Sequence, residues 1–217
     1  MKIAVLIPTR GDRKEFLNNA LRLIKNQTLQ PDHIEIVDFE PLDSACDITP
    51  RYRFGYEKLS KMGFDVILLM EDDDFYAKNY IETMISEWID AGKPDIFGTT
   101  YTIYYNIRVW GQFRMEHYQR SSAMSTLIKP SLEIKWPLNN DPYTDVALYN
   151  QLKYKLFTPK EVICLGIKHG IGLCGGRSHV DGLQRYSTNG GLTDPDKSWI
   201  KSIVDEESFK FYKSLNF

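Results

Sequence analysis

Several features common in other protein classes are scarce or missing in this chain of 217 residues. It has only three cysteines, an odd number, at spacings that match no paired zinc motif. It contains neither a G-x-G-x-x-G fingerprint nor a Walker loop. No apolar run approaches the ~20 residues that cross a bilayer, and the run over residues 3–7 stops at Pro8, too short for a secretion signal. We therefore expect a reduced, cytoplasmic protein without a membrane span.

The charge balance argues against another class of partner. The formal net charge is -2 at pH 7, so no global basic field points to a nucleic acid. Aromatic residues are plentiful, thirteen tyrosines among them, which argues against disorder and favours a site that stacks rings. The length suits one α/β domain.

The most informative segment is residues 66–75. Five apolar residues run directly into Glu71, Asp72, Asp73 and Asp74. The apolar run is typical of a strand buried on both faces, and the acids then fall at its carboxyl end, where ligands bind in open α/β sheets. Adjacent carboxylates repel one another, but a hard divalent cation such as Mg²⁺ or Mn²⁺ would neutralise them. The alternative is a solvated acidic turn, and the position directly after a buried strand favours the metal site.

Apolar spacing predicts the order β-α-β-α-β in about the first 70 residues, the pattern of a doubly wound parallel sheet. The expected strands are 2–7, 34–37 and 66–70, and the expected helices are 14–27 and 51–62. Further along we expect helices over 77–91, 145–153 and 198–214, and strands over 96–109, 124–128 and 161–167, the first of them in a possible hairpin with 112–118. Residues 170–191 hold seven glycines and are expected to form a long mobile loop.

Three loops should meet at one crevice, because they leave the carboxyl ends of consecutive strands. They are residues 9–13, 38–43 and 71–74. Arginines in the first loop suit a diphosphate, an aspartate in the second suits a base or ribose hydroxyl, and the acids of the third suit a metal bound to phosphate.

The segment Ile7-Pro8-Thr9-Arg10, the strand that ends at Asp38 and the run from Met70 to Asp74 together resemble the GT-A glycosyltransferases. The likeness is greatest to the large inverting family 2 type and covers about residues 1–90. It implies a single Rossmann-like GT-A domain over 1–217, with a mostly parallel central sheet flanked by helices. Residues of about 1–95 would form the nucleotide-sugar half. Residues of about 96–217 would form the acceptor half, with a glycine-rich lid and a C-terminal helix.

The resemblance implies roles on the donor side of the site. Pro8, Thr9 and Arg10 would line the nucleotide, and Asp38 would accept a hydrogen bond from the uracil ring. Arg53 would also touch the base, unless it is a solvated arginine on a helix face.

The resemblance also implies a Mn²⁺ or Mg²⁺ site of the DxD type. Asp73 would be the principal ligand and Asp72 would face the donor ribose or sugar. Asp74 takes the metal role if the frame is Asp72-x-Asp74 instead. His169, just past the last expected strand, would add a further ligand, with His179 as the competing candidate.

Inverting members of the family need a carboxylate base on the acceptor side, usually at the start of a helix. Asp145 opens the helix expected over 145–153 and is the candidate, although an acid there also suits the helix dipole alone. The other candidates are Glu133, Asp141 and Glu116. Three cations, Lys168, Arg177 and Arg185, would clamp the pyrophosphate as part of a closing lid, or are solvated loop charges.

The sequence therefore predicts a metal-dependent glycosyltransferase that acts with inversion. The donor would be a nucleoside diphosphate sugar, with a UDP-sugar expected, and the acceptor a hydroxyl of a glycan, glycolipid or glycoprotein. One alternative is a nucleotidyltransferase acting on sugar phosphates, which needs a glycine-rich first loop where only Gly11 is present. The other is a non-catalytic nucleotide-sugar or glycan-binding module, which would not need both the acid run and Asp145.

Overall fold

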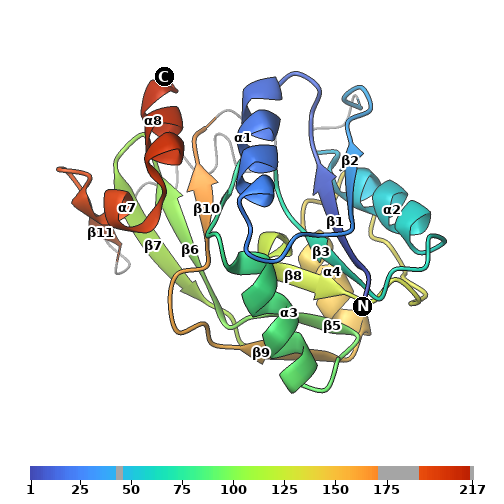
Figure 1. Ribbon diagram of the computed structural model, residues 1–217. Helices are drawn as coiled ribbons and strands as arrows, with labels where there is room; N and C mark the ends of the chain where they lie inside the picture. Colours follow the sequence, from blue (N-terminus) through green and yellow to red (C-terminus); the bar gives the residue numbers. More distant parts are fainter. Residues whose placement is uncertain (43–45, 171–190, 216–217) are drawn as a thin grey trace.

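The computed structural model describes residues 1–42, 46–170 and 191–215, and its larger sheet has six strands in the order β2-β1-β3-β8-β5-β9 (Figure 1). The pairs β1–β2, β1–β3 and β5–β9 are parallel, whereas β8 runs antiparallel to both of its neighbours. The strand bounds are β1 (Ile3–Pro8), β2 (His33–Val37), β3 (Val66–Leu69), β5 (Ile96–Thr99), β8 (Thr126–Ile128) and β9 (Tyr154–Phe157).

A second sheet of five strands has the order β11-β7-β6-β10-β4. Here β6 pairs in parallel with β10, and the other pairs are antiparallel. Both sheets are thus mixed, where the sequence analysis expected one mostly parallel sheet. The strand bounds are β4 (Phe75–Tyr76), β6 (Tyr101–Asn106), β7 (Gly111–Glu116), β10 (Cys164–Lys168) and β11 (Leu192–Thr193).

The four central strands of the larger sheet, β1, β3, β5 and β8, are buried on both faces, as the alternation of side chains along β1 shows. Ile3, Val5 and Ile7 belong to one core cluster, and Ala4 and Leu6 belong to the other. Buried side chains of α1 and α3 join the first cluster, and those of α2 and α4 join the second, so helices cover both faces (Figure 1). The helix bounds are α1 (Lys14–Lys25), α2 (Ile48–Leu59), α3 (Tyr80–Asp90), α4 (Thr144–Gln151), α7 (Ser198–Ile203) and α8 (Glu206–Ser214), with the 3₁₀ turn η1 (Ala123–Ser125) before β8.

Two expected elements are divided in the structure. The strand expected over 96–109 breaks near Thr100, so that β5 pairs in the larger sheet and β6 forms its hairpin with β7 in the smaller one. The C-terminal helix expected over 198–214 breaks at Val204, whose backbone is extended, and α8 restarts at Asp205, whose side chain caps Ser208 N. Periodicity continues across both breaks, which is why the sequence did not show them.

Three strands, β4, β9 and β11, were not predicted at all, and β11 has two residues only, both exposed. β9 lies at an edge of the larger sheet and begins with exposed Tyr154 and Lys155, so it lacks an apolar signal. β4 has two residues only, Phe75 and Tyr76, and directly follows the acid run.

The cysteines differ from expectation. Cys46 is disulfide-bonded, so the prediction of a fully reduced chain is wrong, while Cys164 is a free, buried thiol. Most of the glycine-rich segment predicted as a lid, with Arg177, His179 and Arg185, lies outside the described residues. In the part of the chain that is described, no helix is long and apolar enough to cross a membrane.

Gly55 holds α2 close to the larger sheet, and replacing it should destabilise the protein. A Cβ at Gly55 would overlap Leu6 Cδ1 and lie 3.0 Å from Val37 Cγ2. We expect Gly55→Ala to lower the free energy of unfolding by about 1–3 kcal/mol through overpacking, although alanine has the higher helix propensity by ~1 kcal/mol. Urea unfolding followed by circular dichroism measures the change. Glu57→Ala, at an exposed position of the same helix, is the control, and a Gly55→Ala protein as stable as wild type would contradict the close packing.

Candidate active site

The loops after β1 and β3 meet because these two strands are paired in parallel. Thr9 N donates to Val37 O at 3.0 Å, which joins the end of β1 to the end of β2. Thr9 Oγ1 donates to Asp72 Oδ2 at 2.6 Å, which joins the same loop to the acid run. The structure thus places the loop after β1 beside the acid run and beside the end of β2.

Arg13 bridges two of the acids. Its Nη1 lies 3.0 Å from Asp73 Oδ2 and its Nη2 lies 2.9 Å from Asp72 Oδ1. Burial alone would lower the pKa of Arg13, but Asp73 and Asp72 outweigh burial and raise it. Arg10, which the family resemblance assigned to the nucleotide, pairs with exposed Asp12 at 3.0 Å. No local pattern distinguishes the two arginines, because only the turn into α1 aims Arg13 at the acids.

Asp73 is the best stabilised carboxylate of the run. His169 Nε2 lies 2.9 Å from Asp73 Oδ2, the same oxygen that Arg13 contacts. His169 follows β10, is 4% exposed and packs against the Phe16 ring at 4.6 Å between centroids. Burial would raise the pKa of Asp73, but the hydrogen bond from His169 and the charges of Arg13 and Lys168 hold it well below its usual range.

Asp74 is almost fully buried and only half satisfied. Its Oδ1 accepts a hydrogen bond from Ile167 N at 2.8 Å, which ties the acid run to β10. Its Oδ2 is buried and has no hydrogen-bond partner among the residues that the structure describes. Burial, followed by the charges of Glu71 and Asp73, raises the pKa of Asp74 well above its usual value. An orphaned carboxylate oxygen of this kind calls for a proton or a cation.

Glu71 and Asp72 are also hard to ionise. Tyr52 OH donates to Glu71 Oε1 at 3.3 Å. Burial, with the charge of Asp73 second, raises the pKa of each acid to about 7. Lys168 offsets part of this effect at Glu71, and its ammonium lies 4.8 Å from the centroid of the Tyr104 ring.

The arrangement of these acids fits a divalent cation. Glu71, Asp73 and Asp74 each offer an oxygen, and the three oxygens lie within 4.8 Å of one another. Asp74 also carries the Oδ2 that has no hydrogen-bond partner among the described residues, and oxygen-only ligands suit Mg²⁺ or Mn²⁺. Asp72 differs, because Thr9 and Arg13 already occupy its two oxygens. This group includes Glu71, which was not predicted as a ligand. It also includes both aspartates that were predicted as alternative metal ligands, Asp73 and Asp74.

Asp145 lies in the first turn of α4. Arg120 Nη1 forms an ion pair with Asp145 Oδ2, and Val146 N donates to Oδ1 at 2.9 Å. Burial raises the pKa of Asp145, and its charge in turn raises the pKa of Glu71. The start of α4 is joined to α2 through Thr144 and Thr49, whose hydroxyls lie 2.5 Å apart.

The other candidates for a base have different surroundings. Asp141 Oδ1 accepts from Tyr143 N at 2.8 Å within the turn before α4. Glu116 pairs with Arg114 at 2.6 Å on β7, and Glu133 is exposed.

The remaining predicted nucleotide residues lie along the ends of β1 and β2. Pro8 is buried at the end of β1, and Asp38 is exposed just after β2. The backbone of Asp38 lies beside Gly11, where an added Cβ would be 3.6 Å from Asp38 O. Arg53 is half-buried in α2.

Arg51 in α2 contacts three residues at or after the end of β2. Its guanidinium is 1% exposed, lies 2.7 Å from Asp47 Oδ2 and donates to Val37 O at 3.3 Å. It also lies over the Phe39 ring, 4.2 Å from the centroid. The i,i+4 spacing of Asp47 and Arg51 was a signal that could have identified this pair.

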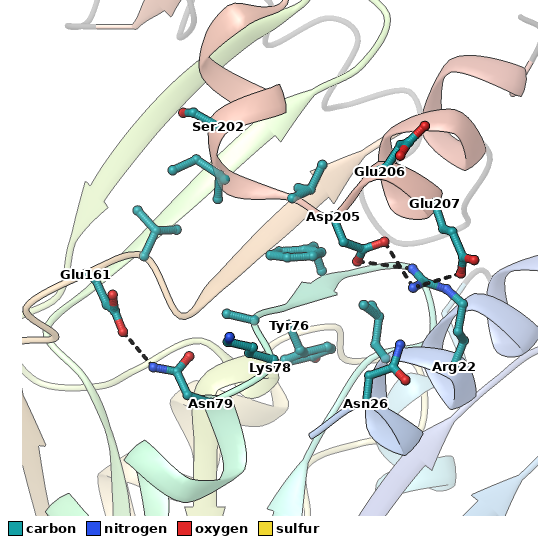
Figure 2. Close-up of a pocket in the computed structure, with 16 residues that line it drawn as sticks. Arg22, Asn26, Tyr76, Lys78, Asn79, Glu161, Ser202, Asp205, Glu206 and Glu207 are labelled. Carbon is teal, nitrogen blue, oxygen red and sulfur yellow. Dashed lines mark hydrogen bonds and ion pairs between the residues drawn. The ribbon is translucent and has the colours of Figure 1, made fainter. Parts of the chain in front are cut away.

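A cavity of about 870 Å³ lies elsewhere, between the second half of α1, the start of α3 and the α7–α8 turn (Figure 2). Arg22 points across its rim to Asp205 and Glu207, and Asn79 donates to Glu161 at 2.6 Å. The acid run, Asp145 and His169 do not line it. The cavity therefore plays no part in the candidate active site.

Comparisons with known proteins agree on the fold only. No protein-family model and no curated protein matches the chain. Among solved structures, S. aureus TarS matches 77% of this chain and 37% of its own at 14% identity, with a TM-score of 0.52. The complex of S. aureus TarS 1–349 with UDP-GlcNAc matches 78% of this chain and 59% of its own at 14% identity, also with a TM-score of 0.52. A197 from STIV matches 73% of this chain and 82% of its own at 16% identity, with a TM-score of 0.45.

The chain thus spans less than two thirds of each of these TarS chains. At such low identity the likeness establishes a shared fold, which in TarS 1–349 holds UDP-GlcNAc.

The raised pKa of Glu71 should make the metal-free protein less stable at higher pH. An acid whose folded pKa exceeds its unfolded pKa stabilises the fold at low pH, and this stability is lost as pH rises through the folded value. For Glu71 the window runs from its ordinary 4.5 to about 7. We expect Glu71→Gln to gain a few degrees in melting temperature over wild type at pH 8 in chelator, and little at pH 5.

The measured quantity is the difference in melting temperature between Glu71→Gln and wild type. This difference cancels the effect of His117, whose burial lowers its pKa to about 4 and which makes both proteins more stable as pH rises. Asp90→Asn, at an exposed position, is the control. An equal difference in melting temperature at pH 5 and pH 8 would show that Glu71 does not titrate between these pH values.

Proposed function

We propose that this protein is a metal-dependent glycosyltransferase with a single GT-A domain, which transfers a sugar from a UDP-sugar to a hydroxyl acceptor with inversion. The observation that carries the proposal is the meeting of Thr9 and Arg13 with the acid run, on a fold shared with a structure that holds UDP-GlcNAc. The site combines an oxygen cluster for a cation, basic groups for a diphosphate and a separate buried carboxylate.

The proposed donor site extends along the ends of β1, β2 and β3. Pro8, Thr9 and Arg10 line the nucleotide, and exposed Asp38 accepts a hydrogen bond from the uracil ring. Arg53 is a second contact for the base, from α2. These five assignments rest on the family resemblance together with their positions at one edge of the sheet.

The cation would be held by Asp73, Asp74 and Glu71, with His169 close enough to Asp73 to join them. A bound Mn²⁺ or Mg²⁺ acts as a Lewis acid that stabilises the charge developing on a diphosphate leaving group. Asp72 faces the donor ribose or sugar once Arg13 or Thr9 releases one of its oxygens.

The chain supplies cations of its own for the leaving group. Arg13 lies at the acid run, and half-buried Lys168 is close enough to Glu71, Asp73 and Asp74 that these acids raise its pKa. Either side chain can turn from a carboxylate to a phosphate oxygen, because a guanidinium and an ammonium bind both kinds of anion.

Asp145 is the proposed general base. It belongs to α4 rather than to the acid run, so it can contact an acceptor while the donor occupies the ends of the strands. In its ionised form it removes the proton from the acceptor hydroxyl, whose oxygen attacks the sugar carbon on the face opposite the diphosphate. This geometry gives inversion, and a positioned base typically contributes ~10²- to 10⁴-fold to the rate.

Nucleotide binding should depend on the divalent cation. We expect calorimetry to show UDP and UDP-GlcNAc binding at least ~10-fold tighter with Mn²⁺ than with excess chelator, because metal-mediated contacts contribute more than 1.4 kcal/mol. Asp73→Asn should remove most of this difference. Equal affinities with Mn²⁺ and with chelator would contradict the proposed metal role, and Asp90→Asn controls for general charge.

Loss of the base should separate binding from transfer. Asp145→Asn is expected to bind UDP with the wild-type affinity and to transfer ~10²- to 10⁴-fold more slowly. Transfer and hydrolysis of UDP-sugars are measured as UDP release, with and without glycan acceptors. Asp141→Asn is the matched control, since its carboxylate caps a turn. UDP binding that falls with Asp145→Asn would place the residue on the donor side instead.

A further inference from the structure

Arg120 lies between β7 and η1 and is the nearest cation to the proposed base. Its Nη1 pairs with Asp145 Oδ2, and the two side chains are 31% and 14% exposed. Within the described ranges, no other cation forms an ion pair with this carboxylate. The pair joins two segments 25 residues apart in sequence, so it depends on the tertiary fold.

The hydrogen bonds of Asp145 show what Arg120 contributes. Oδ1 accepts from Val146 N at 2.9 Å, a bond to the adjacent residue that restrains one oxygen only. Oδ2 accepts from Arg120, so this contact sets the plane of the carboxylate. An ionised carboxylate has about four lone-pair sites, so Asp145 can accept a hydrogen bond from an acceptor hydroxyl in addition to these contacts.

We propose that Arg120 is a positioning residue for the transfer reaction, which orients the carboxylate of Asp145 toward the acceptor and keeps it ionised. The inference rests on the proposed function and adds a residue that the sequence motifs did not indicate.

The electrostatic surroundings support this role. Burial raises the pKa of Asp145, Arg120 lowers it and Asp141 raises it again. The other titratable groups facing Asp145 are Glu71 and the tyrosines, whose pKa values its charge raises: Tyr52, Tyr104 and Tyr149. None of these groups is a cation, so Arg120 is the charge that favours the ionised base.

The test compares Arg120→Gln and Arg120→Lys with wild type. The glutamine variant is expected to lower kcat about 10- to 100-fold at pH 7, the range for loss of a hydrogen bond between charged groups. The acidic limb of its kcat profile should move to higher pH, because the base loses its cation. The affinity for UDP with Mn²⁺ should stay within about twofold. Arg120→Lys, which keeps the charge but loses the planar fork, should recover part of both effects.

Arg114→Gln is the matched control. Arg114 lies on β7, is 50% exposed and pairs with Glu116, so its loss should leave kcat and the pH profile unchanged. Thermal melting of each variant shows whether it is folded. If Arg120→Gln does not fold, Arg120→Lys decides, through its kcat, its pH profile and a ¹³C-carboxyl NMR titration of Asp145.

Three results would overturn the inference. An Arg120→Gln variant with wild-type kcat and pH profile, or with a raised kcat, would show that the ion pair does not help the base. A large loss of UDP affinity would place Arg120 on the donor side. Absence of transfer by wild type itself, with every UDP-sugar tried, would contradict the proposed function and with it this role. Transfer by wild type that Arg120→Gln retains contradicts the role of Arg120 alone.

Discussion

The candidate site depends on how the charge of Asp73 is balanced. Four consecutive acids follow a buried strand, where burial and mutual repulsion both favour the protonated form. Arg13 and His169 converge on a single oxygen of Asp73, and its pKa alone among the four is held below its usual value. Burial, followed by the negative charge of Asp73, raises the pKa values of Glu71 and Asp72 to about 7. The metal-free site therefore holds protons that a divalent cation would displace.

The same contacts explain why two sheets meet at this place. The acid run separates β3, in the larger sheet, from β4, in the smaller one. β4 pairs with β10, whose end delivers His169 to Asp73 and Ile167 N to Asp74. Arg13 comes from 60 residues earlier in the chain and His169 from 96 residues later than Asp73. The contacts that balance Asp73 and Asp74 thus also join the acid run to the second sheet.

The proposed catalytic groups lie on different elements: the acids follow β3, and Asp145 lies in α4. The acids end a strand that is buried along its whole length, and Asp145 begins a helix joined to α2 by a pair of threonine hydroxyls. Such supports suit a site that has to hold donor and acceptor in line, since small displacements reduce the benefit of proximity. The shared fold with TarS agrees with this arrangement, although at 14% identity it carries no residue roles.

The sequence by itself determined the parts of the fold that depend on local patterns. Apolar runs and helical spacing located β1, β2, β3, α1, α2 and α3 to within a few residues, and the position of the acids after a buried strand placed them at the edge of a sheet. The sequence did not predict the antiparallel direction of β8, the break near Thr100 or the short β4. The direction of a strand and the sheet that it joins are set by long-range pairing and not by periodicity.

The partners of each charge were decided by tertiary structure. Sequence reasoning did not predict that Arg13 pairs with the acids, that Arg51 is buried against Asp47 or that Arg120 pairs with Asp145. The sequence shows that arginines lie in or near the loops of the candidate site. Which arginine pairs with a carboxylate depends on the turn into a helix or on a contact between residues 25 or more positions apart. The sequence therefore showed which charged residues are available for the site. Which of them form ion pairs, and which acids are protonated as a result, was decided by the tertiary structure.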